Sequence, residues 1–301
     1  MSENMEITYL NDYSDIIETK KKFALILGYF DGVHIGHVYL INSAKNMSNN
    51  ELAILTFDKP LKKTNQCLTS LNRRLKRFEK LGISKVFILN TDNNLKNLSY
   101  GDFIEKILKK INPAEIFCGP DFKYGHQALG DVNYLKDQFN NVNVVNYLSN
   151  FDKSKISSST IKLLIQNGEM EEAALLLGRQ YRIEGVVCKG KGLGKKLGFP
   201  TANLKLNDDY VIPKCGVYIT KTIINDEVYN SLTNIGTNPT VNENNNMTIE
   251  TYILDFNRDI YDQEILIDFY KLLRCEIKFY SKEELIKAME NDEETARKYF
   301  L

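Results

Sequence analysis

The chain of 301 residues lacks the features that mark several classes of protein. It has no run of about twenty apolar residues that could cross a bilayer, and it does not start with the basic and apolar stretches of a secretion signal. Its 39 basic and 39 acidic side chains cancel, whereas sequence-independent binding to DNA or RNA needs an excess of positive charge. We therefore expect a cytoplasmic protein whose partners are neither nucleic acids nor membranes.

Cysteine and histidine are scarce as well. The five cysteines form no CxxC pair, and their odd number fits no closed disulfide framework, so we predict reduced thiols. Three histidines and scattered cysteines offer almost nothing from which a structural zinc site could be built. All three histidines, His34, His37 and His126, lie in the first half of the chain, and we look for their chemistry there.

The first part of the chain, up to about residue 149, alternates short apolar runs with longer segments of helical period. The apolar runs predict strands at Phe23–Leu27, Leu52–Phe57, Lys85–Leu89, Glu115–Cys118 and Val142–Tyr147, and the periodic segments predict helices at Ile35–Ala44, Leu71–Leu81 and Tyr100–Ile111. Strands joined by helices imply a Rossmann-like α/β domain, with a parallel sheet covered on both faces and ligands at the carboxyl ends of its strands.

The later part of the chain alternates apolar and polar residues and is broken by Gly, Pro and Asn, which is typical of antiparallel strands. The predicted strands are Tyr181–Cys188, Gly216–Ile224, Glu227–Asn234, Thr248–Leu254 and Ile265–Phe269. A small barrel or sandwich closes such strands, and we favour a small antiparallel β-barrel. A terminal helix is predicted from Ser281, which has Glu284 three residues later as in a capping box. Helices at Ser157–Gln166 and Glu169–Leu177 precede this region, and we divide the chain into domains 1–180 and 181–301.

The turn after the first strand favours phosphate binding. It leads from the strand through Gly28 into a helix whose first turn holds His34 and His37. A strand-to-helix turn presents free backbone N–H groups and the positive end of the helix dipole to a phosphate. Gly36 has no side chain, so the phosphate can approach the backbone closely. Imidazoles three residues apart share a helix face, so both can donate to one phosphoryl group. The plain alternative is a pair of exposed or helix-capping histidines.

The segment Phe30-Asp-Gly-Val-His-Ile-Gly-His37 resembles the HxGH signature of the nucleotidyltransferase superfamily, in its FMN adenylyltransferase branch. The second signature of that superfamily, ISSTxxR in form, is approximated by Ile156–Lys162, where Ser159 replaces Thr and Lys162 replaces Arg. Lysine keeps the charge and loses the bidentate fork, and ordinary N-capping also accounts for the serines. The resemblance implies catalytic roles for His34 and His37 and ATP binding by Gly28, Phe30, Asp31, Gly36, Ser157, Ser158, Ser159 and Lys162.

Two further loops bear on this resemblance. Cys118–His126 is similar to the G-x-D-F-x-F-G loop of the family, which implies that Asp121 and Lys123 help to place ATP and the flavin phosphate. Taken alone, this loop is a turn with a charged tip. The family also has an FEPHP-like stretch that contacts flavin. Phe57–Leu61, which reads Phe-Asp-Lys-Pro-Leu, matches that stretch poorly.

The segment Gly190–Asn203 is the densest cluster of Gly and Lys in the chain. Flexible glycines with interspersed lysines suit a flap over nucleotide phosphates, and a solvated basic loop is the alternative. Thr201 and Asn203 carry hard oxygens two residues apart, so in an extended segment they share a face and can hold Mg²⁺ together with phosphate.

This cluster resembles the GxxxGFPTAN signature of riboflavin kinases. Pro213–Tyr218, Asn234–Thr240, Ile249–Phe256 and Leu273–Phe279 also have counterparts in that family, in the same order. The resemblance implies that Gly190, Gly192, Gly194, Gly198, Pro200, Thr201 and Asn203 bind ATP, that Arg274 contacts flavin, and that Glu250 is the catalytic base. Without this resemblance, the sequence pattern predicts that Glu250 is an ordinary surface glutamate. Arg274 could then pair with Glu276 or another surface carboxylate.

Together the resemblances cover nearly the whole chain and imply the bacterial family of bifunctional riboflavin kinase/FAD synthetases. Such an enzyme makes FMN from riboflavin and ATP in the second region, and FAD plus pyrophosphate from FMN and ATP in the first, with Mg²⁺. One alternative is a kinase whose adenylyltransferase domain has decayed, as the departures at Lys162 and Phe57–Leu61 allow. Another is a flavin-sensing regulator without turnover, although a sensor needs neither the base Glu250 nor magnesium ligands.

Overall fold

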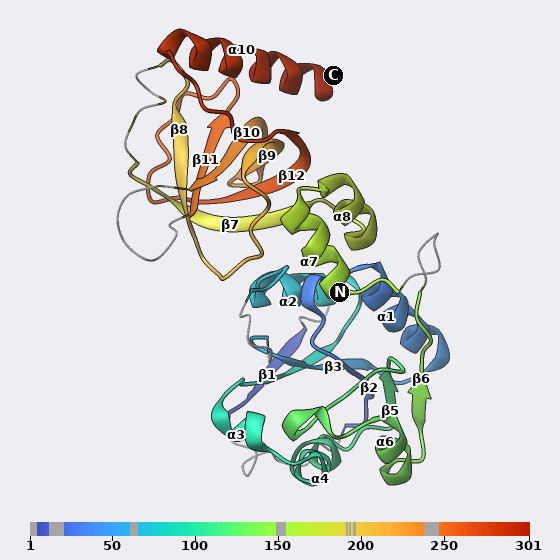
Figure 1. Ribbon diagram of the computed structural model, residues 1–301. Coiled ribbons are helices and arrows are strands. Elements are labelled where there is room, and N and C mark those ends of the chain that lie inside the picture. The colour runs from blue at the N-terminus through green and yellow to red at the C-terminus, as the bar shows by residue number, and fades with distance from the viewer. Residues whose placement is uncertain are drawn as a thin grey trace. The chain divides into compact units, whose positions relative to one another are not determined.

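The computed structural model describes residues 5–11, 21–60, 66–148, 155–190, 192, 194, 197–237 and 247–301. Contacts divide the chain into two compact units, Met1–Ser158 and Ser159–Leu301, which are described one at a time (Figure 1). The predicted domain boundary at residue 180 concerns the two functional regions and stays a prediction. None of the helices in these described ranges is long and apolar enough to cross a membrane.

The first unit contains a parallel sheet of six strands, as the sequence predicts. The strands lie in the order β1 (Glu6–Leu10), β4 (Lys85–Leu89), β3 (Leu52–Phe57), β2 (Ala24–Leu27), β5 (Glu115–Cys118) and β6 (Val142–Val144), and every neighbouring pair runs parallel. β1, at one edge of the sheet, is the strand that the sequence analysis missed. The central position of β2 places the turn that follows it at the middle of the carboxyl edge.

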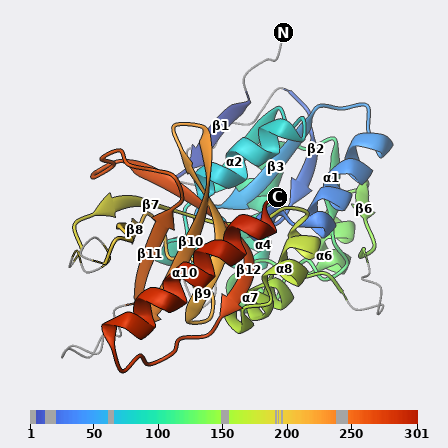
Figure 2. The same cartoon turned by 90° about the horizontal axis from the view of Figure 1, so that it is seen from above.

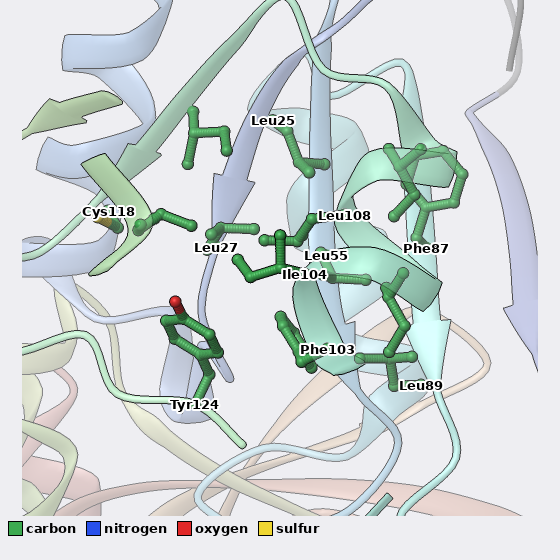
Figure 3. Close-up of a cluster of buried hydrophobic side chains, with 14 of the residues drawn as sticks. Leu25, Leu27, Leu55, Phe87, Leu89, Phe103, Ile104, Leu108, Cys118 and Tyr124 are labelled. Carbon is green, nitrogen blue, oxygen red and sulfur yellow. The ribbon is translucent and has the colours of Figure 1, made fainter. Parts of the chain in front are cut away.

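Helices cover both faces of this sheet (Figure 1). α1 (Ile35–Met47) and α2 (Leu71–Lys80) pack on the face to which Ala24 and Ile26 point. The other face is covered by α3 (Asn93–Asn97), α6 (Val132–Gln138) and a continuous helical stretch made of α4 (Tyr100–Phe103), a π-helical turn (Ile104–Leu108) and α5 (Lys109–Ile111). Figure 3 shows side chains of this second layer, with Leu25 and Leu27 facing Ile104 and Leu108. Successive side chains of β2 therefore point into two different hydrophobic cores, one on each face of the sheet. This explains why the strand is apolar throughout.

The second unit is a closed antiparallel barrel, as predicted. Its strands follow the order β10 (Glu227–Thr237), β11 (Met247–Ile253), β8 (Thr201–Leu206), β7 (Tyr181–Cys188), β12 (Glu264–Arg274) and β9 (Gly216–Ile224). β8, which begins inside the predicted phosphate loop, was not among the predicted strands. α7 (Ser158–Asn167) precedes α8 (Met170–Leu177), which contacts β7 and β12.

Hydroxyl groups fill part of the barrel interior. Five side chains that are fully buried, Thr220, Thr222, Ser231, Thr233 and Thr251, hydrogen-bond to one another. The oxygen–oxygen distances include 2.8 Å between Thr220 and Ser231 and 3.0 Å between Thr233 and Thr251. Because Thr251 points inward on β11, its neighbours Glu250 and Tyr252 point outward.

The outer face of the barrel is covered in part by α10 (Lys282–Tyr299), which Figure 2 shows lying across the barrel strands. Ala296 of this helix packs against Val217, Ile219 and Leu232. As predicted, Ser281 caps the helix by accepting a hydrogen bond from the backbone N–H of Glu284. The outward side chains of Thr201, Glu250 and Tyr252, on β8 and β11, line one cavity together with Leu285 and Met289 of this helix.

Candidate active sites

The turn between β2 and α1 brings His34 and His37 together. His34 is the N-cap of α1, and its Nδ1 accepts a hydrogen bond from the backbone N–H of His37 at 3.4 Å. The two imidazole rings stack with centroids 3.6 Å apart, and the edge of Phe30 meets the ring of His37. His34 is buried and His37 is half-buried, so the alternative of an exposed pair is wrong. The phosphate-binding and helix-capping interpretations both stay open, because the histidines share one face and His34 also caps the helix.

Backbone strain marks the same turn. Phe30, Gly32 and Val33 have φ values of 58°, 83° and 38°. A positive φ is costly for Val33, whose side chain is β-branched. Strained conformations of this kind tend to cluster at functional sites, where the surrounding structure holds them in place. The strain in the turn that bears the two histidines is therefore consistent with a functional site at this position.

The protein surrounds His37 with positive charge that the sequence analysis did not identify. Burial lowers the pKa of His37 well below 6.5, and the charges of His34, Arg74 and Lys155 lower it further. Arg77 of α2 donates from Nε to the backbone oxygen of Val33 at 3.3 Å. A neutral imidazole at His37 among these cations suits a polyphosphate ligand, because the cations supply the charge and the ring supplies a hydrogen bond.

This lowered pKa predicts how the stability of the protein changes with pH. Below about pH 6.5 an unfolded His37 takes up a proton that the folded protein excludes, so the free energy of unfolding falls by up to about 1.4 kcal/mol per pH unit until the folded pKa is reached. Urea unfolding of the wild type and of His37→Gln at several pH values measures this slope. His37→Gln is expected to flatten it, and His126→Gln is the matched control. Equal slopes in the wild type and His37→Gln would contradict the prediction.

Four other predicted residues of the first site lie in or against this turn, namely Gly28, Asp31, Gly36 and Ser158. Asp31 is buried, and its Oδ1 accepts a hydrogen bond from the backbone N–H of Leu68 at 2.7 Å. Ser158 donates from Oγ to the backbone oxygen of Asp31 at 2.9 Å, which joins the second motif to the first. Side chains at Gly28 and Gly36 would press on the rings of Phe30 and His34, at 3.0 and 3.2 Å. Ser157 precedes α7, and Ser159 and Lys162 lie on α7, in the second unit.

The charged loop after β5 binds its own neighbours. Asp121 pairs with Lys155, which also lies over the ring of Tyr147 at 4.1 Å from the centroid. Lys123 pairs with Asp131 at 3.4 Å on the surface. The two predicted residues of this loop thus have different charge partners among the described residues. Leu61 of the poorly kept flavin stretch lies outside the described residues.

The second site is built on the outward face of β8, β11 and β10. Glu250 of β11 lies directly opposite Asn203 on one side and Asn234 on the other. Residues opposite each other in antiparallel strands point to the same face, so these three side chains form one row. Thr201 donates from Oγ1 to Oε2 of Glu250 at 3.0 Å. The predicted base is thus oriented by one of the predicted magnesium ligands.

A cavity of about 230 Å³ opens beside Glu250. Its lining is largely apolar and comes from the barrel, the segment after β12 and α10. The residues are Phe199, Thr201, Val217, Leu232, Asn234, Glu250, Tyr252, Arg274, Glu276, Ile277, Phe279, Leu285, Met289 and Asp292. Apolar walls with a few convergent polar groups are typical of a small-molecule site.

Arg274 faces this cavity and is held by α10. Its guanidinium donates from Nε and Nη2 to the carboxylate of Asp292, at 2.8 to 3.0 Å, and Asp292 is only 7% exposed. The carboxylate partner is therefore a buried residue of the terminal helix, whereas the sequence analysis considered Glu276 or another surface carboxylate. Flavin contact by Arg274 stays a prediction.

The glycine-rich loop lies against the same row of side chains. A Cβ on Gly190 would overlap the amide of Asn203, and one on Gly194 would overlap the backbone oxygen of Phe199. Gly192 and Gly198 have φ values of 67° and 91°, which glycine adopts most easily, and Pro200 directly precedes β8. Residues 191, 193, 195, 196 and 238–240 of the predicted segments lie outside the described ranges.

Comparisons with known proteins agree with the two predicted regions of the chain. A family model described as "FAD synthetase" matches residues 16–160, and one described as "Riboflavin kinase" matches residues 177–300. The chain is 36% identical to the bifunctional riboflavin kinase/FMN adenylyltransferase of Bacillus subtilis (strain 168), over 95% of each chain. It is also 36% identical to the protein of that name from Listeria monocytogenes, over 92% of each.

A solved structure has the same fold over nearly the whole chain. It is titled a macrolide-efflux protein from Streptococcus pneumoniae, is 27% identical, and superposes with a TM-score of 0.89 over 97% of this chain and 99% of that one. The two family models fall on the two regions in which the motifs were found, and the full-length relatives join both regions in one chain. This protein therefore belongs to the family of bifunctional riboflavin kinase/FMN adenylyltransferases.

Proposed function

We propose that the chain makes FMN from riboflavin and ATP at the barrel site, and FAD plus pyrophosphate from FMN and ATP at the site after β2. The observation that carries the first half is the position of Glu250, which is oriented by Thr201 at the edge of a largely apolar cavity. Such a cavity suits the flat isoalloxazine ring, and a carboxylate at its edge suits the ribityl 5′-hydroxyl. The use of ATP at both sites accords with the cytoplasmic location expected from the sequence.

In the kinase reaction Glu250 takes the proton from the ribityl 5′-hydroxyl. That oxygen then forms a bond to the γ-phosphorus of ATP as the bond from this phosphorus to the bridging oxygen breaks, which releases ADP. A positioned base contributes roughly a hundred- to ten-thousandfold to such a rate. The hydrogen bond from Thr201 keeps the carboxylate in one orientation, so less freedom has to be lost when the substrate binds.

Magnesium fits the residues of the barrel site. Thr201 and Asn203 offer a hydroxyl and an amide oxygen beside the carboxylate of Glu250, and hard oxygens are the ligands that Mg²⁺ prefers, completed by nucleotide phosphates and water. We propose that Thr201 and Asn203 would hold the ion that arrives with ATP, and that the bound ion would supply charge neutralisation for phosphoryl transfer. The glycines against Asn203 and Thr201 let the loop backbone approach the same phosphates.

At the first site the phosphate of FMN attacks ATP. One of its oxygens forms a bond to the α-phosphorus while the bond from that phosphorus to the α–β bridging oxygen breaks, so that pyrophosphate leaves. His34 and His37 donate hydrogen bonds to the phosphoryl groups, with further charge from Lys155 and, by resemblance, Lys162. Catalysis here is positioning and charge stabilisation, because no covalent enzyme intermediate is needed.

One incubation tests both halves of this proposal. Purified protein is mixed with riboflavin, ATP and Mg²⁺, and the flavins are separated by chromatography over time. FMN is expected to appear first and FAD later, and addition of EDTA is expected to stop both. FMN without FAD would leave only the kinase, in line with a decayed first site, and neither product would favour a flavin-sensing regulator.

A further inference from the structure

Arg74 is a buried cation at the carboxyl ends of two neighbouring strands. It lies on α2, and the residue is only 1% exposed. Its guanidinium donates to the backbone oxygen of Tyr29, after β2, at 2.8 Å, and to the backbone oxygens of Phe57 and Asp58, at the end of β3, at 2.9 and 3.0 Å. It also donates to Oγ1 of Thr56 at 3.1 Å. One side chain therefore ties together the ends of β2 and β3.

The surroundings of this guanidinium are unusual for a buried charge. Every hydrogen bond that the described residues provide ends on a carbonyl or hydroxyl oxygen, and Nε has no partner among them. The ring of Tyr29 stacks on it with the centroid 4.6 Å from Cζ. Asp31 and Asp58 are close enough to offset part of the cost of burying this charge, but neither carboxylate accepts one of the hydrogen bonds that the described residues provide. A buried charge without a hydrogen-bonded carboxylate is costly to keep, so packing alone gives a poor reason for an arginine here.

The two loops that Arg74 joins both bear on the first site. Tyr29 leads into the strained turn that carries Phe30 and His34. Phe57 and Asp58 begin the stretch that corresponds to a flavin loop in the family resemblance. A shift of about 1 Å in such groups can cost roughly a hundredfold in rate even when it starts away from the reacting atoms.

We propose that Arg74 is a positioning residue for adenylyl transfer, which fixes the turn after β2 against the loop after β3 and so sets the placement of His34 and His37. The inference rests on the proposed FAD synthesis at this site. Arg74 acts through the groups that it holds, and its charge also reaches His37. The groups that set the charge around His37 are His34 at the start of its own helix, Arg74 of α2 and Lys155.

The test compares Arg74→Met and Arg74→Lys with the wild type in the full chain, with Lys76→Met as the control because it removes an exposed cation from the same helix. The rates of FAD formation from FMN and of FMN formation from riboflavin are measured in the same preparations. Arg74→Met is expected to lower the kcat of FAD formation about a hundredfold, with FMN formation unchanged. Arg74→Lys, which keeps the charge without the fork, is expected to recover most of that loss.

The pH profile separates this role from simple support of the fold. Loss of the positive charge near His37 raises the pKa of that histidine, so the acid limb of FAD formation is expected to move to higher pH in Arg74→Met and to stay in place in Arg74→Lys. If Arg74→Met does not fold, Arg74→Lys decides through an intermediate kcat with unchanged KM values.

Two results would overturn the inference. One is a wild-type kcat of FAD formation in folded Arg74→Met. The other is a loss of FAD formation in Arg74→Met that merely follows the unfolded fraction, with the pH profile in place and no recovery in Arg74→Lys. A wild type that makes no FAD would instead refute the proposed function.

Discussion

Replacement of Glu250 by glutamine is expected to lower the kcat of riboflavin phosphorylation by about two to four orders of magnitude, while FAD formation from supplied FMN keeps its rate. Glutamine has the size of glutamate, and its amide oxygen can accept the hydrogen bond that Thr201 now donates at 3.0 Å. The cavity beside it is therefore expected to keep its shape. What the variant lacks is a basic oxygen for the proton of the 5′-hydroxyl.

The measurement follows FMN and FAD separately, first with riboflavin and then with FMN as the flavin substrate. Glu283→Gln is the matched control, since it removes an exposed carboxylate from the first turn of α10, outside the cavity lining. A loss of less than tenfold in Glu250→Gln would return Glu250 to the role of a surface glutamate. Loss of both reactions in a folded variant would mean that the two sites are not independent.

The fold could be predicted where the side-chain period is regular. The four inner strands of the parallel sheet, β2 to β5, are short apolar runs, because helices cover both faces of the sheet and leave no polar side. β1 was missed because an edge strand is largely exposed, and Glu6–Leu10 buries only its last residue fully. The π-helical turn at Ile104–Leu108 could not be seen either, since an apolar segment keeps a nearly helical period across such a turn.

The barrel interior shows a limit of the alternation rule. In β9 and β10 the polar residues Thr220 and Ser231, which a simple alternation of apolar and polar residues would place outward, are fully buried and hydrogen-bonded to each other. A hydroxyl can enter a core when another hydroxyl satisfies it. Which residues meet across the barrel depends on the pairing of strands, and the pattern within one strand does not contain that information.

Distance along the chain distinguishes the site residues that the sequence analysis found from those that it missed. Residues within one motif, such as His34 and His37 or Thr201 and Asn203, are close in sequence, and local spacing was enough to group them. Arg74 lies 45 residues from Tyr29, whose backbone oxygen it binds. Asp292 reaches Arg274 only because α10 docks on the barrel. Contacts of this kind follow from topology, which a single sequence shows only in outline.

Replacement of His34 is expected to abolish FAD formation and to leave FMN formation intact. Loss of one positioned donor from a phosphoryl or acyl transfer site typically costs about a hundred- to a thousandfold in rate. His34→Ala also removes the N-cap of α1, because Nδ1 of His34 accepts from the backbone N–H of His37, and loss of a cap costs about 1 kcal/mol of stability. The alanine variant alone therefore mixes two effects.

His34→Asn separates them. Asparagine is among the best N-cap residues, so this variant keeps the start of α1 and loses only the imidazole. If the ring serves the reaction, His34→Asn unfolds in urea like the wild type and still forms FAD at least about a hundredfold more slowly, whereas both variants phosphorylate riboflavin at the wild-type rate. If the histidine only caps the helix, His34→Asn makes FAD at the wild-type rate and His34→Ala loses activity in proportion to its stability. The single change of one ring for one amide thus distinguishes the two interpretations of the histidine pair that the sequence left open.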